Sequence, residues 1–265
     1  RPKGVSERLN RCLLCGACAK SCPRGVNIIE IFLTARAVMA GYKQLSPLKR
    51  FFLRKVLANP ALFDRLAERG ARWQGRLFSG GNAPAAGGSC ATLVSPLLPD
   101  RHIVPLAPVP FHKQPPPVAR PDAGIRVALF VGCIIDKLYP QVATAMIKAL
   151  QHHGVDVAVP AAQGCCGIPA LAGGDPIAFN RMVEGRLAVF DPSGFDYLIT
   201  GCATCTAVIK NLWPVFFKPE PGPSALDRQG AVRAIAEKTQ DVQAFLVNVL
   251  GVSPTARPPA GDNAP

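Results

Sequence analysis

Long apolar runs are missing from the sequence, and acidic residues are scarce. Residues 26–40 are almost continuously apolar, but Glu30 and Arg36 interrupt them, and the stretch is too short and too charged for a membrane-spanning helix. The 265 residues include 17 Asp and Glu against 30 Lys and Arg, a formal net charge of +13. The chain starts at Arg1 without Met or a signal peptide, so we expect a piece of a longer polypeptide.

Motifs that mark self-contained enzymes are also absent. The sequence contains no G-x-G-x-x-G dinucleotide fingerprint, no P-loop and no G-x-S-x-G nucleophile motif. Chemistry on an organic acid would therefore require a partner subunit.

Cysteine, in contrast, is plentiful. Ten cysteines suit a disulfide framework in a small secreted protein, but nine of these ten fall into two compact groups with metal-binding spacing. Such grouping favours a reducing compartment, and we expect a cytoplasmic protein. The tenth, Cys90, stands alone and is predicted to be an incidental thiol.

The first group has the spacing C-x2-C-x2-C-x3-C-P, which is the bacterial ferredoxin signature. Its members are Cys12, Cys15, Cys18 and Cys22. We predict that they bind a cubane 4Fe-4S cluster, with zinc as the alternative. In two-cluster ferredoxins the fourth cysteine of each motif ligates the other cluster, yet only eleven residues precede Cys12. Either Cys22 closes a single cluster, or a first motif is missing, which is the interpretation that we prefer.

The second group follows three strand-like runs, at residues 125–131, 155–159 and 195–200. Its members are Cys133, Cys165, Cys166, Cys202 and Cys205. Apolar residues at helical spacing occupy the two intervals, so the order β-α-β-α-β predicts a parallel sheet with helical crossovers. Ligand sites in such sheets lie at the carboxyl ends of the strands, where one site collects all five sulfurs.

Zinc takes four ligands, and adjacent cysteines strain such a site, so five thiolates favour an iron–sulfur assembly over the alternatives of a zinc site or buried free cysteines. The arrangement Cys133, then Cys165-Cys166-Gly167, then C-x-x-C resembles the cysteine-rich CCG domain of the heterodisulfide reductase family over about residues 124–215. The resemblance implies a noncubane 4Fe-4S cluster on the five cysteines. Asp136 and Lys137 follow Cys133 closely and are candidates to line the site or to lie at the surface.

The charge is concentrated in the first part of the chain. Residues 1–82 contain sixteen Lys or Arg and four Asp or Glu, a net of +12. Basic helices beside apolar ones suit an anionic membrane surface, an acidic partner subunit or simple exposure to solvent. Nucleic acid is not expected as a ligand, because no recognition motif accompanies the basic residues.

The predicted fold is α+β overall, with an all-α domain followed by an α/β domain. We expect a helical ferredoxin-like domain at 1–80, a Pro- and Gly-rich linker at 81–122, a CCG domain at 123–250 and a disordered tail at 251–265. Within the CCG domain, His152 and His153 are predicted to end a helix, and residues 231–250 to form one amphipathic helix.

The combination of a ferredoxin motif and a CCG domain resembles the central part of the iron–sulfur subunit of glycolate or D-lactate oxidase complexes. That family carries two ferredoxin motifs and two CCG domains, whereas this chain has one of each. The resemblance implies electron transfer from an FAD-dependent dehydrogenase subunit toward quinone or another carrier, with a peripheral membrane contact as a further expectation. The alternatives are thiol–disulfide chemistry at the CCG cluster, as in heterodisulfide reductase, and a zinc-stabilised interaction module.

Overall fold

The computed structural model describes residues 2–78, 105–118 and 124–253. Cys90 lies outside these ranges, as do parts of the predicted linker and tail.

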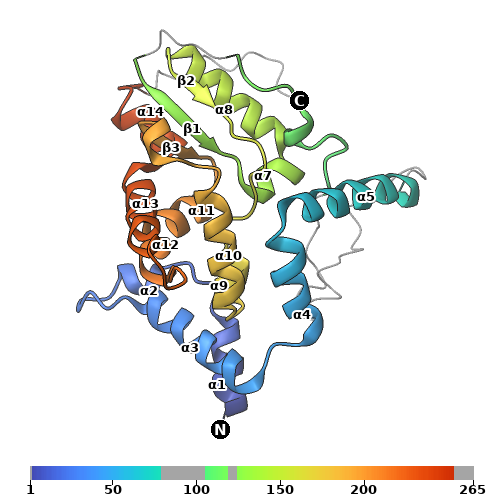
Figure 1. The fold of residues 1–265 in the computed structure, drawn as a ribbon, viewed down its shortest axis with the longest axis vertical. Coiled ribbons are helices and arrows are strands. Elements are labelled where there is room, and N and C mark those ends of the chain that lie inside the picture. The colour runs from blue at the N-terminus through green and yellow to red at the C-terminus, as the bar shows by residue number, and fades with distance from the viewer. Residues whose placement is uncertain (1, 79–104, 119–123, 254–265) are drawn as a thin grey trace, which may run out of the picture.

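A four-stranded parallel sheet is the centre of the fold (Figure 1), and three of its strands and their parallel arrangement agree with the prediction. Its strand order is β2-β1-β3-β4. The strands are β1 (Arg126–Phe130), β2 (Asp156–Ala158), β3 (Tyr197–Thr200) and β4 (Thr239–Asp241). Val127 of β1 pairs with Val157 of β2 and with Tyr197 of β3, which fixes the register of the three strands that lead to the cysteines.

Helices connect the strands. They are α7 (Gly132–Leu138), α8 (Pro140–His152), α9 (Ile168–Ala172), α10 (Pro176–Leu187), α11 (Ala203–Ala207), α12 (Trp213–Phe216), α13 (Ala225–Lys238) and α14 (Val242–Asn248). Short 3-10 helices lie at η2 (Phe111–Lys113) and η3 (Pro192–Gly194), and the π-helical turn η4 (Val208–Leu212) joins α11 to α12. Helix α8 ends at His152, with His153 as its C-cap residue, as predicted. The described part of the predicted linker, which includes η2, contacts α7 and α8.

The single helix predicted at 231–250 is wrong, because strand β4 divides it. The hydroxyl of Thr239 donates to the carbonyl oxygen of Ile235 at 2.7 Å, where α13 ends. The carboxylate of Asp241 then accepts from the backbone N–H of Gln243 and starts α14. Between these caps, β4 pairs with β3 along the edge of the sheet, so backbone pairing overrides the helical spacing of the apolar residues.

Apolar side chains pack on both faces of the sheet. On β1, Val127 and Leu129 belong to one buried cluster with residues of α8 and α14, whereas Ala128 and Phe130 belong to a second. This alternation is the period-two pattern of a strand that is covered on both faces.

The described residues before 79 are helical and share the second cluster. They form α1 (Pro2–Arg11), α2 (Ala17–Lys20), α3 (Ile28–Lys43), α4 (Pro47–Phe51), the π-helical turn η1 (Phe52–Leu57) and α5 (Pro60–Phe78). Leu33, Leu53 and Leu57 pack in the same apolar core as Cys165 and Phe179. Helix α3 contacts α9, and η1 contacts α10 (Figure 1). The ferredoxin-motif segment is therefore continuous with the core beneath the sheet.

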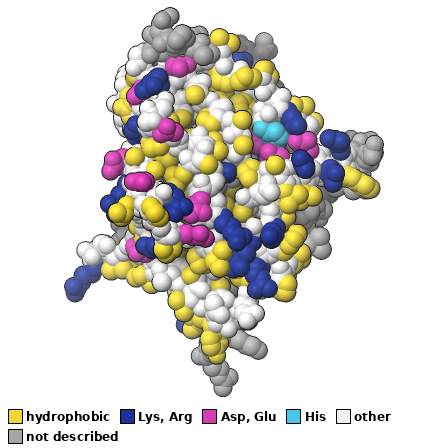
Figure 2. Space-filling model, viewed as in Figure 1, with side chains coloured by type: hydrophobic (Ala, Val, Ile, Leu, Met, Phe, Trp, Pro, Cys, Tyr) yellow, Lys and Arg dark blue, Asp and Glu magenta, His cyan; other side chains and the backbone are white. Residues whose placement is uncertain are grey.

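The basic residues of the N-terminal part lie largely on the surface. Lys49, Arg50, Arg54 and Lys55 come from α4 and η1. Figure 2 shows Lys and Arg side chains gathered around the position of α4 on this face.

Candidate metal centre

The five cysteines of the second group lie at the carboxyl edge of the sheet. Cys133 is in the first turn of α7 after β1, and Cys165 and Cys166 are in the loop between β2 and α9. Cys202 is the N-cap residue of α11 after β3, and Cys205 lies within that helix. Three consecutive strand ends thus carry the three cysteine segments to one place.

Two glycines allow the cysteine-bearing loops to pack closely against neighbouring segments. Gly132 has φ +71°, and a Cβ there would lie 3.3 Å from the Cys205 sulfur, so the β1 loop runs directly against the β3 loop. Gly167 has φ +97°, and a Cβ there would lie 2.8 Å from the ring of Phe179. Both conformations are unfavourable for residues with a side chain. The glycine after the cysteine pair therefore lets this turn pack onto α10.

Hydrogen bonds join the five thiols in a row. Cys133 donates to Cys165, and Cys165 donates to Cys166. The Cys205 thiol lies between Cys166 and Cys202, and its single S–H can donate to either sulfur. The sequence-predicted set is brought together completely, in one connected group in which three sulfurs are buried and those of Cys133 and Cys202 are half-buried.

The contacts and burial shift the pKa values of these thiols in different directions, and three of the five are raised. Donation to Cys165 and burial raise the pKa of Cys133, and the neighbouring sulfurs of Cys166 and Cys202, together with burial, raise the pKa of Cys205. The hydrogen bond from Cys133 lowers the pKa of Cys165, but donation to Cys166 and burial outweigh it, and the pKa is raised to about 12.

The accepting thiols behave in the opposite way. Hydrogen bonds from Cys165 and Cys205 lower the pKa of Cys166 well below its ordinary value. A hydrogen bond from Cys205 lowers the pKa of Cys202 to about 5. The arrangement therefore stabilises negative charge on two sulfurs, and thiolate is the form in which cysteine binds metals.

Polar groups behind the thiols fix their backbone. The indole N–H of Trp213, which is fully buried, donates to the carbonyl oxygen of Cys166 at 2.9 Å. The hydroxyls of Thr200 and Thr206 lie 2.6 Å apart and each 3.2 Å from the carbonyl oxygen of Cys202. Such outer partners orient metal ligands.

A buried arginine accompanies the site, and the sequence analysis missed it. Arg186 of α10 is 4% exposed, and its Nε has no hydrogen-bond partner within the described residues. A Cβ on Gly164 would lie 2.1 Å from its Nη1, so the guanidinium presses against the backbone just before Cys165. Burial lowers the pKa of Arg186, while the charges of Cys165 and Asp64 act to raise it. The sequence signal for Arg186 is its helical spacing from Phe179, Met182 and Val183, which places it on the apolar face of α10.

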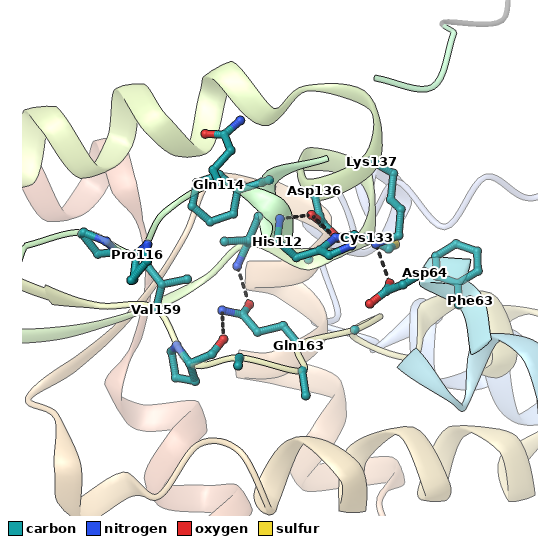
Figure 3. A pocket seen from close by; sticks show the side chains of 18 of the residues that line it. Phe63, Asp64, His112, Gln114, Pro116, Cys133, Asp136, Lys137, Val159 and Gln163 are labelled. Carbon is teal, nitrogen blue, oxygen red and sulfur yellow. Dashed lines mark hydrogen bonds and ion pairs between the residues drawn. The ribbon is translucent and has the colours of Figure 1, made fainter. Parts of the chain in front are cut away.

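A pocket of about 360 Å³ opens beside Cys133 (Figure 3). Asp136 and Lys137 line it, and Lys137 is only 6% exposed, so neither is a remote surface group. The ammonium of Lys137 contacts Asp136 and also Asp64, at 2.7 Å. His112 lies 3.0 Å from a carboxylate oxygen of Asp136. Asp64, His112 and Asp136 are close enough to share a cation, but the Lys137 ammonium already contacts both carboxylates.

The first cysteine group has a different setting. Cys15 and Cys18 are exposed, and Cys12 and Cys22 are half-buried. Hydrogen bonds from the backbone N–H groups of Val26 and Arg24 lower the pKa of the Cys22 thiol.

One arginine joins this group to the region of the second. The guanidinium of Arg36 on α3 donates to the carbonyl oxygens of Leu9 and Cys12, both at 2.6 Å. It also donates to the carbonyl oxygen of Ala172 at 3.2 Å, which ties the ferredoxin motif to α9.

Residues 127–210 match the family model of the cysteine-rich CCG domain. This segment is a CCG domain. Cys133, Cys165, Cys166, Cys202 and Cys205 all fall within it.

Relatives of the chain carry oxidoreductase and iron–sulfur names. It is 26% identical to a subunit of the fumarate reductase (CoM/CoB) of Methanothermobacter marburgensis, over 80% of this chain and 34% of that protein. It is 32% identical to lactate utilization protein A of Geobacillus thermodenitrificans, over 48% of this chain and 50% of that protein. An uncharacterized iron–sulfur protein of Methanococcus maripaludis is 33% identical, over 33% of this chain and 18% of its own length.

The chain therefore spans only between 18% and 50% of the length of these relatives. No solved structure matches it significantly. Among the helices of the described residues, none is both long and apolar enough to span a membrane.

The donor set of the CCG domain fits an iron–sulfur cluster. The five convergent thiols exceed the four ligands of tetrahedral zinc, and soft sulfur donors favour iron–sulfur assemblies. The site is largely shielded from solvent, because Cys165, Cys166 and Cys205 are each 6% exposed or less.

Proposed function

We propose that the chain is an iron–sulfur electron-transfer subunit of an oxidoreductase complex. Electrons come from a partner flavoprotein of the glycolate or D-lactate dehydrogenase class and leave toward quinone or another carrier. The observation that carries the proposal is the row of five convergent, largely buried thiols in a CCG domain, together with the absence of motifs for chemistry on an organic acid. The relative named lactate utilization protein A supports the choice of substrate class.

The cofactors of this proposal are a noncubane 4Fe-4S cluster at the CCG site and a cubane 4Fe-4S cluster at the ferredoxin motif. The ligands are the cysteines of the two groups, Cys133, Cys165, Cys166, Cys202 and Cys205 for the first cluster and Cys12, Cys15, Cys18 and Cys22 for the second. A bound cluster supplies single-electron transfer.

The protein's own residues create the environment for that transfer. Burial of the cysteine pair excludes water, and the Trp213 hydrogen bond holds the Cys166 backbone. The guanidinium of Arg186 offsets part of the negative charge that gathers on the thiolates.

The pocket beside Cys133 favours a second candidate function. A ligand there would lie next to the CCG thiols, as thiol–disulfide chemistry requires, and one relative is named as a CoM/CoB fumarate reductase subunit. Electron transfer remains our first choice, because the described pocket walls present no unpaired cationic side chain for an acidic disulfide.

The proposed domains are those expected from the sequence, 1–80 and 123–250, with a linker at 81–122 and a tail at 251–265. We propose a cytoplasmic site of action, peripheral to the membrane.

Electron delivery from the partner tests the proposal. Anaerobically reconstituted protein is mixed with the flavoprotein and its 2-hydroxy acid, and reduction of the clusters is followed by absorption. Cys166→Ser should slow this reduction strongly, while Cys90→Ser serves as a matched control that changes nothing. Dithionite-driven turnover of a disulfide that Cys166→Ser abolishes would replace electron transfer with the second candidate.

A further inference from the structure

The pocket beside Cys133 is built from parts of the chain far apart in sequence. Phe63 comes from α5, Phe111 from η2 and Val159 from the loop after β2. Three consecutive prolines, Pro115 to Pro117, complete the apolar wall. Its volume of about 360 Å³ falls within the range of about 300–1,000 Å³ for small-molecule sites.

A glutamine holds the wall of this pocket in place. The amide nitrogen of Gln163 donates to the carbonyl oxygens of Leu129 and Pro160, at 2.8 and 3.1 Å. Its amide oxygen accepts from the backbone N–H of Val131 at 2.8 Å. The loop after β2 is thus fastened to the end of β1, so the pocket is preformed (Figure 3).

The charged groups at the pocket are paired with one another. Lys137 contacts Asp64 and Asp136, and His112 lies between Asp136 and Glu68, with 3.1 Å from its Nε2 to the Glu68 carboxylate. The hydrogen bond from His112 lowers the pKa of Glu68, so this carboxylate is ionised. A substrate with its own carboxylate would meet paired cations and nearby negative charge, which disfavours organic acids. An uncharged, mainly apolar molecule fits better.

Cys133 is part of the pocket wall, so such a molecule would lie directly beside the CCG site. Lys137 also lies on this wall; its ammonium carries three N–H groups, and its two carboxylate partners leave one for a further acceptor. The pocket therefore combines an apolar slot, a hydrogen-bond donor and contact with a cluster ligand.

From this combination we propose that the pocket binds the head group of a quinone. The proposal rests on the proposed electron-transfer function and assigns its acceptor site. The planar, neutral ring packs between the aromatic and proline walls, and one carbonyl oxygen accepts from Lys137. Reduction to the quinol takes two electrons, which the reduced partner flavoprotein supplies, and two protons from water, which form the two O–H bonds.

Equilibrium binding tests the assignment. Decylubiquinone is titrated by calorimetry into the anaerobically reconstituted full chain and into Val159→Trp, in which an indole fills the pocket. The control is Val142→Trp, the same change at a half-exposed position on α8 outside the pocket. We expect Val159→Trp to weaken binding at least about tenfold, because the indole occupies much of the volume. Val142→Trp should bind as the parent does.

A second variant keeps the test decisive if Val159→Trp fails to fold. Ala161→Trp places an indole on an exposed position that also lines the pocket, and it should likewise weaken binding. Iron content and the paramagnetic signal of the reduced CCG cluster show that each variant is loaded. Equal affinity in all loaded variants would overturn the proposal, as would tight, competing binding of oxidised glutathione in place of the quinone.

The same samples distinguish this inference from the function on which it rests. If ferricyanide oxidises the dithionite-reduced clusters but no quinone binds, the pocket assignment fails and electron transfer stands. If the clusters cannot be reduced and reoxidised at all, the proposed function fails, whatever binds in the pocket.

Discussion

The two cysteine groups of this chain have contrasting structural support. The CCG cysteines come from segments up to 72 residues apart, from Cys133 to Cys205, and they meet because three parallel strands end at one edge. The ferredoxin-motif cysteines span eleven residues, from Cys12 to Cys22, and lie in exposed or half-exposed positions around the short helix α2. Close spacing in the sequence therefore does not bury the ferredoxin-motif cysteines. The parallel sheet, in contrast, brings distant cysteines together in a largely buried site.

The physical reason lies in what stabilises the local conformation. Burial of the sheet and its two apolar clusters stabilises the CCG loops before any metal arrives. Next to Cys15, Leu14 packs against the core but Leu13 is 83% exposed, so we expect cluster binding to supply much of the ordering free energy of this loop. The CCG loops are held by buried packing, whereas the ferredoxin-motif cysteines lie in exposed or half-buried positions.

The largest expected effect is the loss of one cluster without loss of the other when a single cysteine is replaced. Cys166→Ser should remove the CCG cluster and leave the ferredoxin-type cluster, and Cys15→Ser should do the reverse, because each group supplies its own ligands. Iron and sulfide content and the paramagnetic signals of the reduced protein measure both. Loss of both clusters from either soluble, folded variant would show that the two sites are interdependent.

Removal of the metal should affect the two regions unequally. In cluster-free protein we expect backbone amides of β1 and β3 to remain protected from hydrogen exchange, since their ladder is buried in the core. Amides of residues 12–22 should exchange rapidly, and slow only when the cluster is restored. The measurement is hydrogen exchange by mass spectrometry with and without reconstitution. Equal protection of residues 12–22 and of β1 and β3 in cluster-free protein would contradict the expected difference in local stability.

An ion pair between the regions should contribute a moderate free energy of unfolding. Arg54 of η1 contacts the buried carboxylate of Asp175 at 2.7 Å, and Asp175 also caps α10 by accepting from the N–H of Ala178. Because Arg54 is 30% exposed, we expect Arg54→Ala to lower the free energy of unfolding by about 2 kcal/mol, a discounted value for an unpaired buried charge. Denaturant unfolding measures this, with the exposed Arg50→Ala as control. A loss no larger than that of the control would mean that solvent compensates Asp175.

The smallest expected effect concerns the potential of the CCG cluster. Arg186→Gln removes a buried positive charge near Cys165, so the reduced, more negative cluster loses stabilisation and its potential falls. We expect a shift on the order of 60 mV, which for one electron is about tenfold in the equilibrium constant. Arg186→Lys should shift the potential less because it keeps the charge. Redox titration followed by the paramagnetic signal measures both; equal shifts would mean that packing, and not charge, is responsible.

Sequence reasoning located the CCG site because strand-like runs and cysteines coincide three times. The convergence of Cys133, Cys165 and Cys202 follows from the parallel topology alone. Strand β4 was missed because Thr-Gln-Asp has no apolar alternation, and its pairing with β3 is a long-range contact.

The pocket could not be predicted for a similar reason. Phe63 and Phe111 lie in segments assigned to a separate domain and to a linker, and no local pattern shows that either approaches Cys133. Arg186 stood out only as a charge on an apolar helix face, and its proximity to Cys165 depends on the packing of α10. The local spacing of apolar residues predicts helices and strands. The pocket and the position of Arg186 depend instead on which helices and strands pack against each other.

The hydrogen bond from Arg36 to Ala172 has a consequence for assembly during synthesis. It joins residues 136 positions apart, so the ribosome has already released α3 long before its partner on α9 exists. Until then, the Arg36 side chain can hold the carbonyl oxygens of Leu9 and Cys12 but has no anchor in the sheet-containing part. The N-terminal helices cannot dock on α9 until that helix has been translated. The ferredoxin motif can therefore reach its final position only after α9 has been translated.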